Sequence, residues 1–142
     1  LFPLGVAALS EAVALIAAGN APGIAQDHAE ATYEPPLADG HAGIAWHEPA
    51  ARIHAQIRGC NPQPGAWTSF KGARLRIFDC ELSHELEPGM PGRVIRIAAD
   101  SFDIRLNGGV LRVKRVLPEG GKKINAGEWA TSAGLQEGFR FR

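Results

Sequence analysis

The spacing of hydrophobic residues changes near residue 59, and the change divides the chain into a helical part and a strand-rich part. Before residue 59, apolar residues recur every three to four positions over residues 5–18 and 49–58, the spacing of one buried face of an α-helix. Pro49 falls in the first turn of the second helix, where proline is tolerated. Residues 20–43 hold few large apolar side chains and several Pro and Gly. We therefore expect two helices separated by a linker.

After residue 59, apolar and polar residues alternate, as in strands with one buried face. The predicted strands are a segment that begins at Trp67, then residues 73–82, 93–98, 101–106 and 110–117. Asn107-Gly108-Gly109 is typical of a tight hairpin turn. We predict a small open barrel of about five strands over residues 65–118. Its buried positions are expected at Leu75, Ile77, Val94, Ile104 and Val113. A last helix is predicted from the N-cap Asn125 to the region of Gly134.

The segment between the second helix and the first strand is predicted to be a rigid turn. Gly59 stands where a helix commonly ends in a residue with positive φ. Pro62 and Pro64 exclude helix and restrict the residues before them to extended conformations. Gly65 permits a sharp bend just before Trp67. The chain should therefore reverse direction between residues 59 and 65.

Composition indicates one ordinary globular domain with an appendage. The chain has 142 residues, 45% of them hydrophobic, and a formal net charge of zero. The charges are unevenly placed: residues 1–58 hold two bases and six acids, whereas residues 59–142 hold 13 bases and nine acids. A mildly basic C-terminal part is compatible with nucleic-acid contact but does not require it.

The sequence offers no metal site and no catalytic constellation. Cys60 and Cys80 are not in a CxxC motif and have no histidines at zinc spacing. We expect both to be unpaired thiols, with Cys60 an inert side chain in the packed turn. The apolar run of residues 6–18 is too short to span a bilayer. We expect a cytoplasmic location with no membrane partner. A start at Leu1 without Met leads us to expect a piece of a longer protein.

Several motifs resemble the C-terminal domain of the 10-formyltetrahydrofolate-dependent formyltransferases. The central motif is Pro62-x-Pro64-Gly65-Ala66-Trp67, followed by Lys71-Gly72-x-Arg74-Leu75-x-Ile77. Weaker matches lie on both sides of it, at Leu1-Phe2-Pro3-Leu4-Gly5, Ala31-Thr32-Tyr33 and Gly120-Gly121-Lys122-Lys123. The resemblance therefore runs along nearly the whole chain.

This resemblance implies a mostly β fold, an OB-like small open barrel preceded by an N-terminal helix and a long linker. It implies that residues 1–19 are the closing helix of an absent catalytic domain, 20–43 the linker and 44–142 the OB-like C-terminal domain. The chemistry of the family sits in an N-terminal Rossmann-like domain, with 10-formyltetrahydrofolate as co-substrate of the full-length enzyme. We therefore assign this chain no catalytic, cofactor-binding or metal-ligating residue, and expect it to bind no cofactor and to show no formyltransferase activity alone.

Two branches of the family remain open, and they differ in the formyl acceptor. In the methionyl-tRNA formyltransferase branch, the barrel helps to hold initiator tRNA, and the Gly-Lys-Lys loop at Lys122 favours this branch. The hydrolase module of 10-formyltetrahydrofolate dehydrogenase and related enzymes act on water or small molecules. Gln63, where the tRNA enzymes usually carry an aromatic residue, favours this second branch. A freestanding OB-like binding module is a third reading, which the N-terminal helix argues against.

Six basic residues are candidates for contact with nucleic-acid phosphates. They are Lys71, Arg74, Arg76, Arg115, Lys122 and Lys123. The competing interpretation is a solvated barrel exterior on which these side chains simply alternate outward. Trp67 and Trp129 can in principle stack on bases, although core positions are the more common use of such residues.

Overall fold

The computed structural model describes residues 2–142, so Leu1, the first residue of the predicted closing helix, lies outside the described residues. The chain forms two compact units, Leu1–Pro35 and Pro36–Arg142. The division falls inside the segment 20–43 that was predicted to be a linker, because residues 36–43 belong to the second unit. The predicted division into residues 1–19, 20–43 and 44–142 stays a prediction.

The first unit consists of one long helix and an extended tail. Helix α1 spans Phe2–Ala17 and confirms the predicted helix, beginning three residues earlier. All of its described residues are exposed. Gly19 follows with a φ of +69°, a backbone conformation that favours glycine. A single turn of 3-10 helix, η1 (His28–Glu30), is capped by the Asp27 carboxylate, which accepts a 2.9 Å hydrogen bond from the Ala29 N–H.

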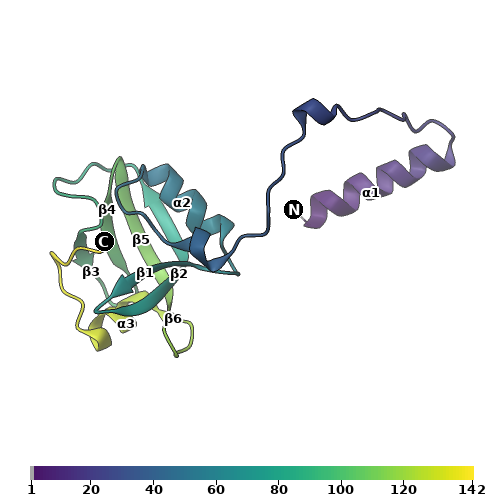
Figure 1. Ribbon diagram of the computed structural model, residues 1–142. Helices are drawn as coiled ribbons and strands as arrows, with labels where there is room; N and C mark the ends of the chain where they lie inside the picture. The colour runs from purple at the N-terminus through teal and green to yellow at the C-terminus, as the bar shows by residue number, and fades with distance from the viewer. Residues whose placement is uncertain (1) are drawn as a thin grey trace. The chain divides into compact units, whose positions relative to one another are not determined.

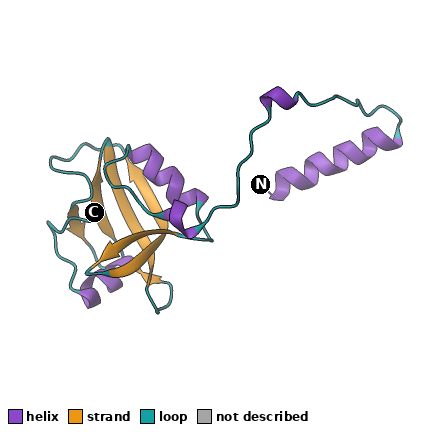
Figure 2. Ribbon diagram, in the orientation of Figure 1, coloured by secondary structure: helices purple, strands orange, loops and turns teal. Residues whose placement is uncertain are grey.

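The second unit is built on one antiparallel sheet that curls into an open barrel (Figures 1 and 2). The strands are β1 (Ala66–Phe70), β2 (Ala73–Ser83), β3 (Val94–Ile97), β4 (Phe102–Leu106), β5 (Gly109–Pro118) and the short β6 (Ile124–Asn125). Their order in the sheet is β1-β2-β5-β4-β3, with β6 paired to β5. This confirms the predicted mostly β, small open barrel of five main strands, and β6 is an addition to it.

Two tight turns fix the register of the sheet. Leu106 pairs with Gly109, so Asn107-Gly108 forms the predicted hairpin turn, with Gly108 at a φ of +94°. The β1–β2 turn places Lys71 at a φ of +50° and Gly72 at +85°. Phe70 pairs with Ala73 across this turn. Lys71 therefore adopts a left-handed backbone conformation that residues other than glycine rarely adopt.

The two edges of the sheet are covered by irregular segments. At β1, the Ile44 N–H donates a 2.8 Å hydrogen bond to the Trp67 carbonyl. At β3, Val94 exchanges backbone hydrogen bonds with Gly138 and Phe139, each 2.8 Å long. Backbone groups of both edge strands thus find partners in η2 (Asp39–Ala42) and its flanking residues or in the C-terminal segment.

Helix α2 (Ala50–Gly59) packs against β2 and β5. Pro49 is its N-cap residue and lies just before the first turn, not within it as predicted. The prediction of positive φ at Gly59 was wrong. The helix continues through Gly59, and the Cys60 N–H donates a 2.9 Å hydrogen bond to the Gln56 carbonyl. The bend predicted at Gly65 is present: the φ of Gly65 is +82°, and its N–H donates a hydrogen bond to the Cys60 carbonyl.

Helix α3 (Ala126–Ala133) packs against β4, β5 and β6 and confirms the predicted last helix. The Asn125 side chain accepts hydrogen bonds from the Gly127 and Glu128 N–H groups, as an N-cap does. Gly134 ends the helix in the left-handed conformation, with a φ of +67°.

The core lies between the concave face of the sheet and the two helices. The five positions predicted to be buried are at most 1% exposed: Leu75, Ile77, Val94, Ile104 and Val113. An aromatic group that includes Phe70, Phe102, Trp129 and Phe141 completes it. Trp46 and Trp129 are 3% and 6% exposed and both belong to this core. Within residues 2–142, every buried side-chain nitrogen and oxygen has a hydrogen-bond partner.

Candidate nucleic-acid interface

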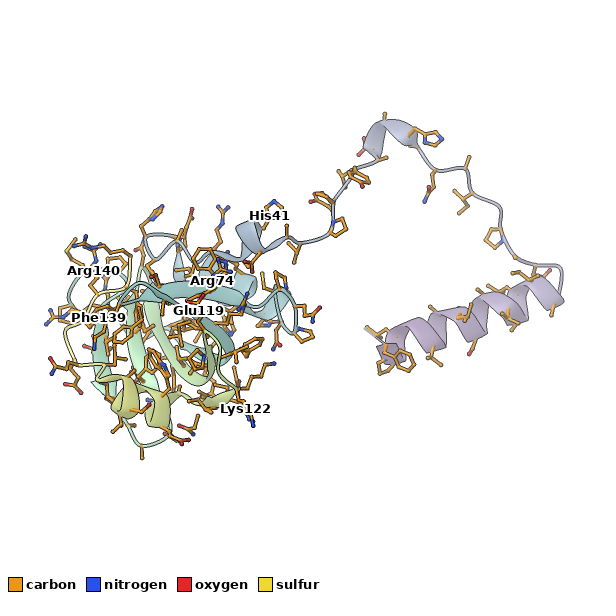
Figure 3. The ribbon with its side chains drawn as sticks, turned by 60° about the horizontal axis from the view of Figure 1, so that its bottom comes forward. His41, Arg74, Glu119, Lys122, Phe139 and Arg140 are labelled. Carbon is orange, nitrogen blue, oxygen red and sulfur yellow. The ribbon has the colours of Figure 1, made fainter. Side chains whose placement is uncertain are left out.

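Arg74 and Arg76 point outward from β2 because they alternate with the buried Leu75 and Ile77. Their neighbours on β1 are Ser69 and Trp67, respectively. The two arginine side chains are 36% and 27% exposed, so each carries a guanidinium at the surface on a partly covered stem. The backbone N–H of Arg74 also donates a 2.9 Å hydrogen bond to the Glu119 carboxylate (Figure 3).

One carboxylate bridges the two arginines. Asp39, the first residue of η2, accepts a hydrogen bond from Arg74 through Oδ2 and one of 3.3 Å from Arg76 through Oδ1. The backbone carbonyl of Asp39 accepts a 2.8 Å hydrogen bond from the indole N–H of Trp67. Residue 39 is therefore fixed to the barrel by its main chain and paired with the arginines by its side chain.

Trp67 is a half-buried platform beneath this cluster. The guanidinium carbon of Arg74 lies 4.4 Å from the centroid of its ring system, in cation–π geometry. Arg74 therefore covers one face of the Trp67 ring. Trp67 is thus neither fully in the core nor open to a base on the side of Arg74, and its contacts with Arg74 and Asp39 support the arginine cluster.

Arg76 and Lys123 line one groove at the surface of the barrel. The ammonium group of Lys123 lies 3.6 Å from the centroid of the Phe78 ring. Arg76 also donates a 3.2 Å hydrogen bond from Nε to the Pro64 carbonyl. The groove is lined by Leu37, Asp39, Pro62, Gln63, Pro64, Arg76, Phe78, Leu117 and Lys123. It therefore combines two cations, one carboxylate and an aromatic ring.

The six predicted phosphate-contacting residues are not all at one place. Arg74 and Arg76 share Asp39, and Arg76 and Lys123 share the groove. Arg115 is exposed on β5, where its neighbours in the sheet register are Asp79 of β2 and Asn125 of β6. Lys122 is exposed in the loop before β6 (Figure 3). Lys71 instead donates a hydrogen bond to the Ala133 carbonyl. Their role in binding stays a prediction.

Sequence reasoning missed Asp39. Asp39-Gly40 is a turn signal, but nothing in the local sequence shows that the side chain reaches two arginines 35 and 37 positions away. It also missed a charge network on the outer face of the sheet. The nearly buried Asp103 carboxylate accepts two hydrogen bonds from Arg112, 2.9 and 3.0 Å long, and Arg96 lies 3.5 Å away.

Hydrogen bonding within this network favours the charged forms of Arg112 and Lys114. The hydrogen bond with Asp103, helped by the charge of that carboxylate, raises the pKa of Arg112. The Lys114 ammonium pairs with Glu81, and this hydrogen bond raises the pKa of Lys114. On this face the Asp103 and Glu81 carboxylates each pair with a cation, and Arg96 adds a second cation beside Asp103.

Neither cysteine has the environment of a nucleophile. Cys60 is 2% exposed, and burial raises the pKa of its thiol. Burial, together with the charge of Asp79, raises the pKa of Cys80 to about 11. Both thiols are unpaired and protonated at neutral pH.

Among residues 2–142, no cluster of His, Cys, Asp and Glu is arranged to hold a metal ion. No helix in the same residues has the length and apolar character needed to cross a bilayer.

Comparison with known proteins agrees with the resemblance seen in the sequence. Residues 37–134 match the family described as the formyl transferase, C-terminal domain. A methionyl-tRNA formyltransferase of Moorella thermoacetica is 40% identical over 124 residues, which are 87% of this chain and 40% of that protein. One of Heliobacterium modesticaldum is 35% identical over 149 aligned residues, 99% of this chain and 47% of that protein. The chain thus spans less than half of the length of these relatives.

Solved structures confirm the fold. HypX from Aquifex aeolicus in complex with tetrahydrofolic acid superposes on 86% of this chain with a TM-score of 0.66 and 18% sequence identity, and the match covers 22% of HypX. A HypX variant matches 91% of the chain with a TM-score of 0.68. At this level of identity the likeness concerns the fold alone.

Proposed function

We propose a function for this chain from its family, since it belongs to the formyl transferase C-terminal domain family. In this proposal, the chain is the acceptor-binding part of an enzyme that formylates initiator methionyl-tRNA. The formyl donor would be 10-formyltetrahydrofolate. The curated relatives described above support the tRNA branch, since they carry the name methionyl-tRNA formyltransferase.

The observation that carries this proposal is the cluster of Arg74 and Arg76 beside Lys123. Phosphate groups are recognised by guanidinium donors held at fixed positions, and each such interaction adds affinity that does not depend on sequence. Arg74 is held by Trp67 and Arg76 by the Pro64 carbonyl, so neither side chain must be ordered when a phosphate arrives. The groove that Arg76 and Lys123 line is where we place the nucleic-acid backbone.

The chemistry is assigned to an N-terminal catalytic domain. We therefore place no folate-binding residue among residues 2–142, and we derive no step through 10-formyltetrahydrofolate. In this proposal residues 1–19 close the catalytic domain, 20–43 link it to the barrel and 44–142 bind the acceptor.

The proposal is tested by fluorescence anisotropy of labelled initiator tRNA with the 142-residue chain across a salt series. We expect binding at low salt, with a slope of log K against log salt that becomes shallower by about one unit for each phosphate group that a variant no longer binds. Arg74→Ala/Arg76→Ala should weaken binding and reduce the slope. Arg52→Ala/Arg58→Ala, on exposed positions of α2, removes the same charge and is the matched control. Failure to bind at low salt, or equal losses of affinity in both double variants, would contradict the proposal.

The second candidate is a formyltransferase or hydrolase with a small acceptor. Asp39 favours it, because one carboxylate offsets part of the charge of Arg74 and Arg76. Gln63 in the groove is the other supporting feature. Absence of tRNA binding in the salt series above would move the assignment to this branch.

A further inference from the structure

The Asp39 carboxylate lies where a phosphate group would meet the basic cluster. Its two oxygens are divided between the two arginines, Oδ2 to Arg74 and Oδ1 to Arg76. One nitrogen of each guanidinium therefore donates to Asp39 and not to a ligand. A phosphate that binds through these two nitrogens must displace the carboxylate from them.

The side chain of Asp39 is held loosely, whereas its backbone is held firmly. The carboxylate is 45% exposed, and ion pairs at such exposure contribute little to stability. The backbone carbonyl, in contrast, receives the 2.8 Å hydrogen bond from Trp67. The carboxylate can thus turn away from the arginines while residues 38–40 stay on the barrel.

We propose that Asp39 is a displaceable carboxylate that holds Arg74 and Arg76 in the unbound protein and releases them to phosphate of the bound nucleic acid. This inference rests on the proposed function and adds a control on affinity to it. A phosphate has more acceptor oxygens than a carboxylate and accepts two parallel hydrogen bonds from a guanidinium. Because one pairing must break first, a single phosphate gains little. A ligand that brings several phosphates at once, with Lys123 as a further partner, overcomes the competition.

The test compares Asp39→Asn with the wild-type 142-residue chain in the tRNA salt series. Asparagine keeps the shape of the side chain and the hydrogen bond between the residue 39 carbonyl and Trp67. It removes the negative charge that competes with phosphate for the arginines. We expect about threefold to tenfold tighter binding at low salt. The salt slope should steepen by up to about one unit. In the background of Arg74→Ala/Arg76→Ala, Asp39→Asn should have no further effect, since the carboxylate acts through the arginines.

Glu85→Gln is the matched control, since it makes the same charge change in the β2–β3 loop, on a groove that Arg112 and Asp103 line. It should change the affinity less than Asp39→Asn does. The inference is overturned if Asp39→Asn binds tRNA no more tightly than the wild type does. It is also overturned if Glu85→Gln raises the affinity for tRNA as much as Asp39→Asn does. If Asp39→Asn binds more weakly than the wild type, Asp39 positions the arginines for the ligand and does not compete with it.

A second measurement does not depend on tRNA. Inorganic tripolyphosphate, which brings several phosphate groups at once, is titrated into the labelled chain, and NMR follows the carboxyl carbon of Asp39, the Nε of Arg74 and the indole N–H of Trp67. We expect the first two signals to shift together while the Trp67 signal stays nearly constant. An Asp39 signal that does not move with that of Arg74 overturns the inference. If tripolyphosphate displaces Asp39 but tRNA does not bind, the proposed function fails and the displaceable carboxylate stands.

Discussion

The ammonium group of Lys71 donates a 3.0 Å hydrogen bond to the carbonyl oxygen of Ala133, although the two residues are 62 positions apart. The last carbonyls of a helix have no partner within the helix, and a cation complements the negative end of its dipole. The same ammonium lies 4.9 Å from the centroid of the Phe70 ring. Lys71 therefore fastens the β1–β2 turn to the end of α3.

This relationship gives a prediction in which glycine is the milder substitution. Lys71→Ala should lower the free energy of unfolding by about 0.5–1 kcal/mol, since it removes both the hydrogen bond and the cation–π interaction with Phe70. Lys71→Gly should cost less, because at a φ of +50° an L side chain carries strain of about 1 kcal/mol that glycine does not. Urea unfolding of the three proteins checks the order. A glycine variant less stable than the alanine variant would show that the turn is not strained.

A second prediction concerns the buried hydrogen bond between Trp46 and Thr68. The indole N–H of Trp46 donates to the Thr68 hydroxyl at 2.9 Å. Thr68→Val keeps the shape but leaves the indole N–H without an acceptor, so it should cost about 1–3 kcal/mol. Thr131→Val, which alters an exposed hydroxyl on α3, should stay within about 0.5 kcal/mol. Chemical denaturation measures both, and equal destabilisation would disprove the special role of position 68.

The core should be sensitive to truncation at Ile77. This side chain is 0% exposed and lies on the concave face of the sheet. Ile77→Ala leaves a cavity and should lower the free energy of unfolding by about 2–5 kcal/mol. Leu86→Ala is the control, because Leu86 is 82% exposed. Differential scanning calorimetry should show a large fall in Tm for the first variant only. A comparable fall at Leu86 would mean that the β2–β3 loop is packed in solution.

Stability should decline in alkaline solution through Cys80. Its pKa is raised from 9.0 to about 11, so the folded state holds the thiol proton more tightly than the unfolded state does. The resulting stabilisation is complete below about pH 9 and is lost as the pH rises towards 11. The free energy of unfolding of the wild type should therefore fall more steeply over this interval than that of Cys80→Ser. Parallel curves would show that burial does not protect the thiol.

Features with local causes could be predicted from the sequence. The Asn125 cap, the left-handed Gly134 and the Asn107-Gly108 hairpin each depend on residues a few positions away. The buried face of β2 followed from alternation, since a strand with one buried face repeats every two residues. The sequence pattern was enough for these elements because each is determined by neighbours along the chain.

Features that depend on distant contacts could not be predicted. Asp39 pairs with residues 35 and 37 positions away, so it received no role, and Lys71 was grouped with Arg74 although its hydrogen bond is with α3. The error at Gly59 has a similar origin. The helix ends where Cys60 enters the core, and Gly65, not Gly59, has the positive φ.

The covering of both edge strands has a consequence for how the domain behaves at high concentration. An uncovered edge is a template on which a second chain can add a strand, which is a common start of aggregation. Here the Trp67 carbonyl is already bonded to Ile44, and Val94 is already bonded to Gly138 and Phe139. Molecules of the domain therefore have little opportunity to join edge to edge. Shortening the chain before Gly138 would remove this protection at β3 and make the barrel prone to self-association.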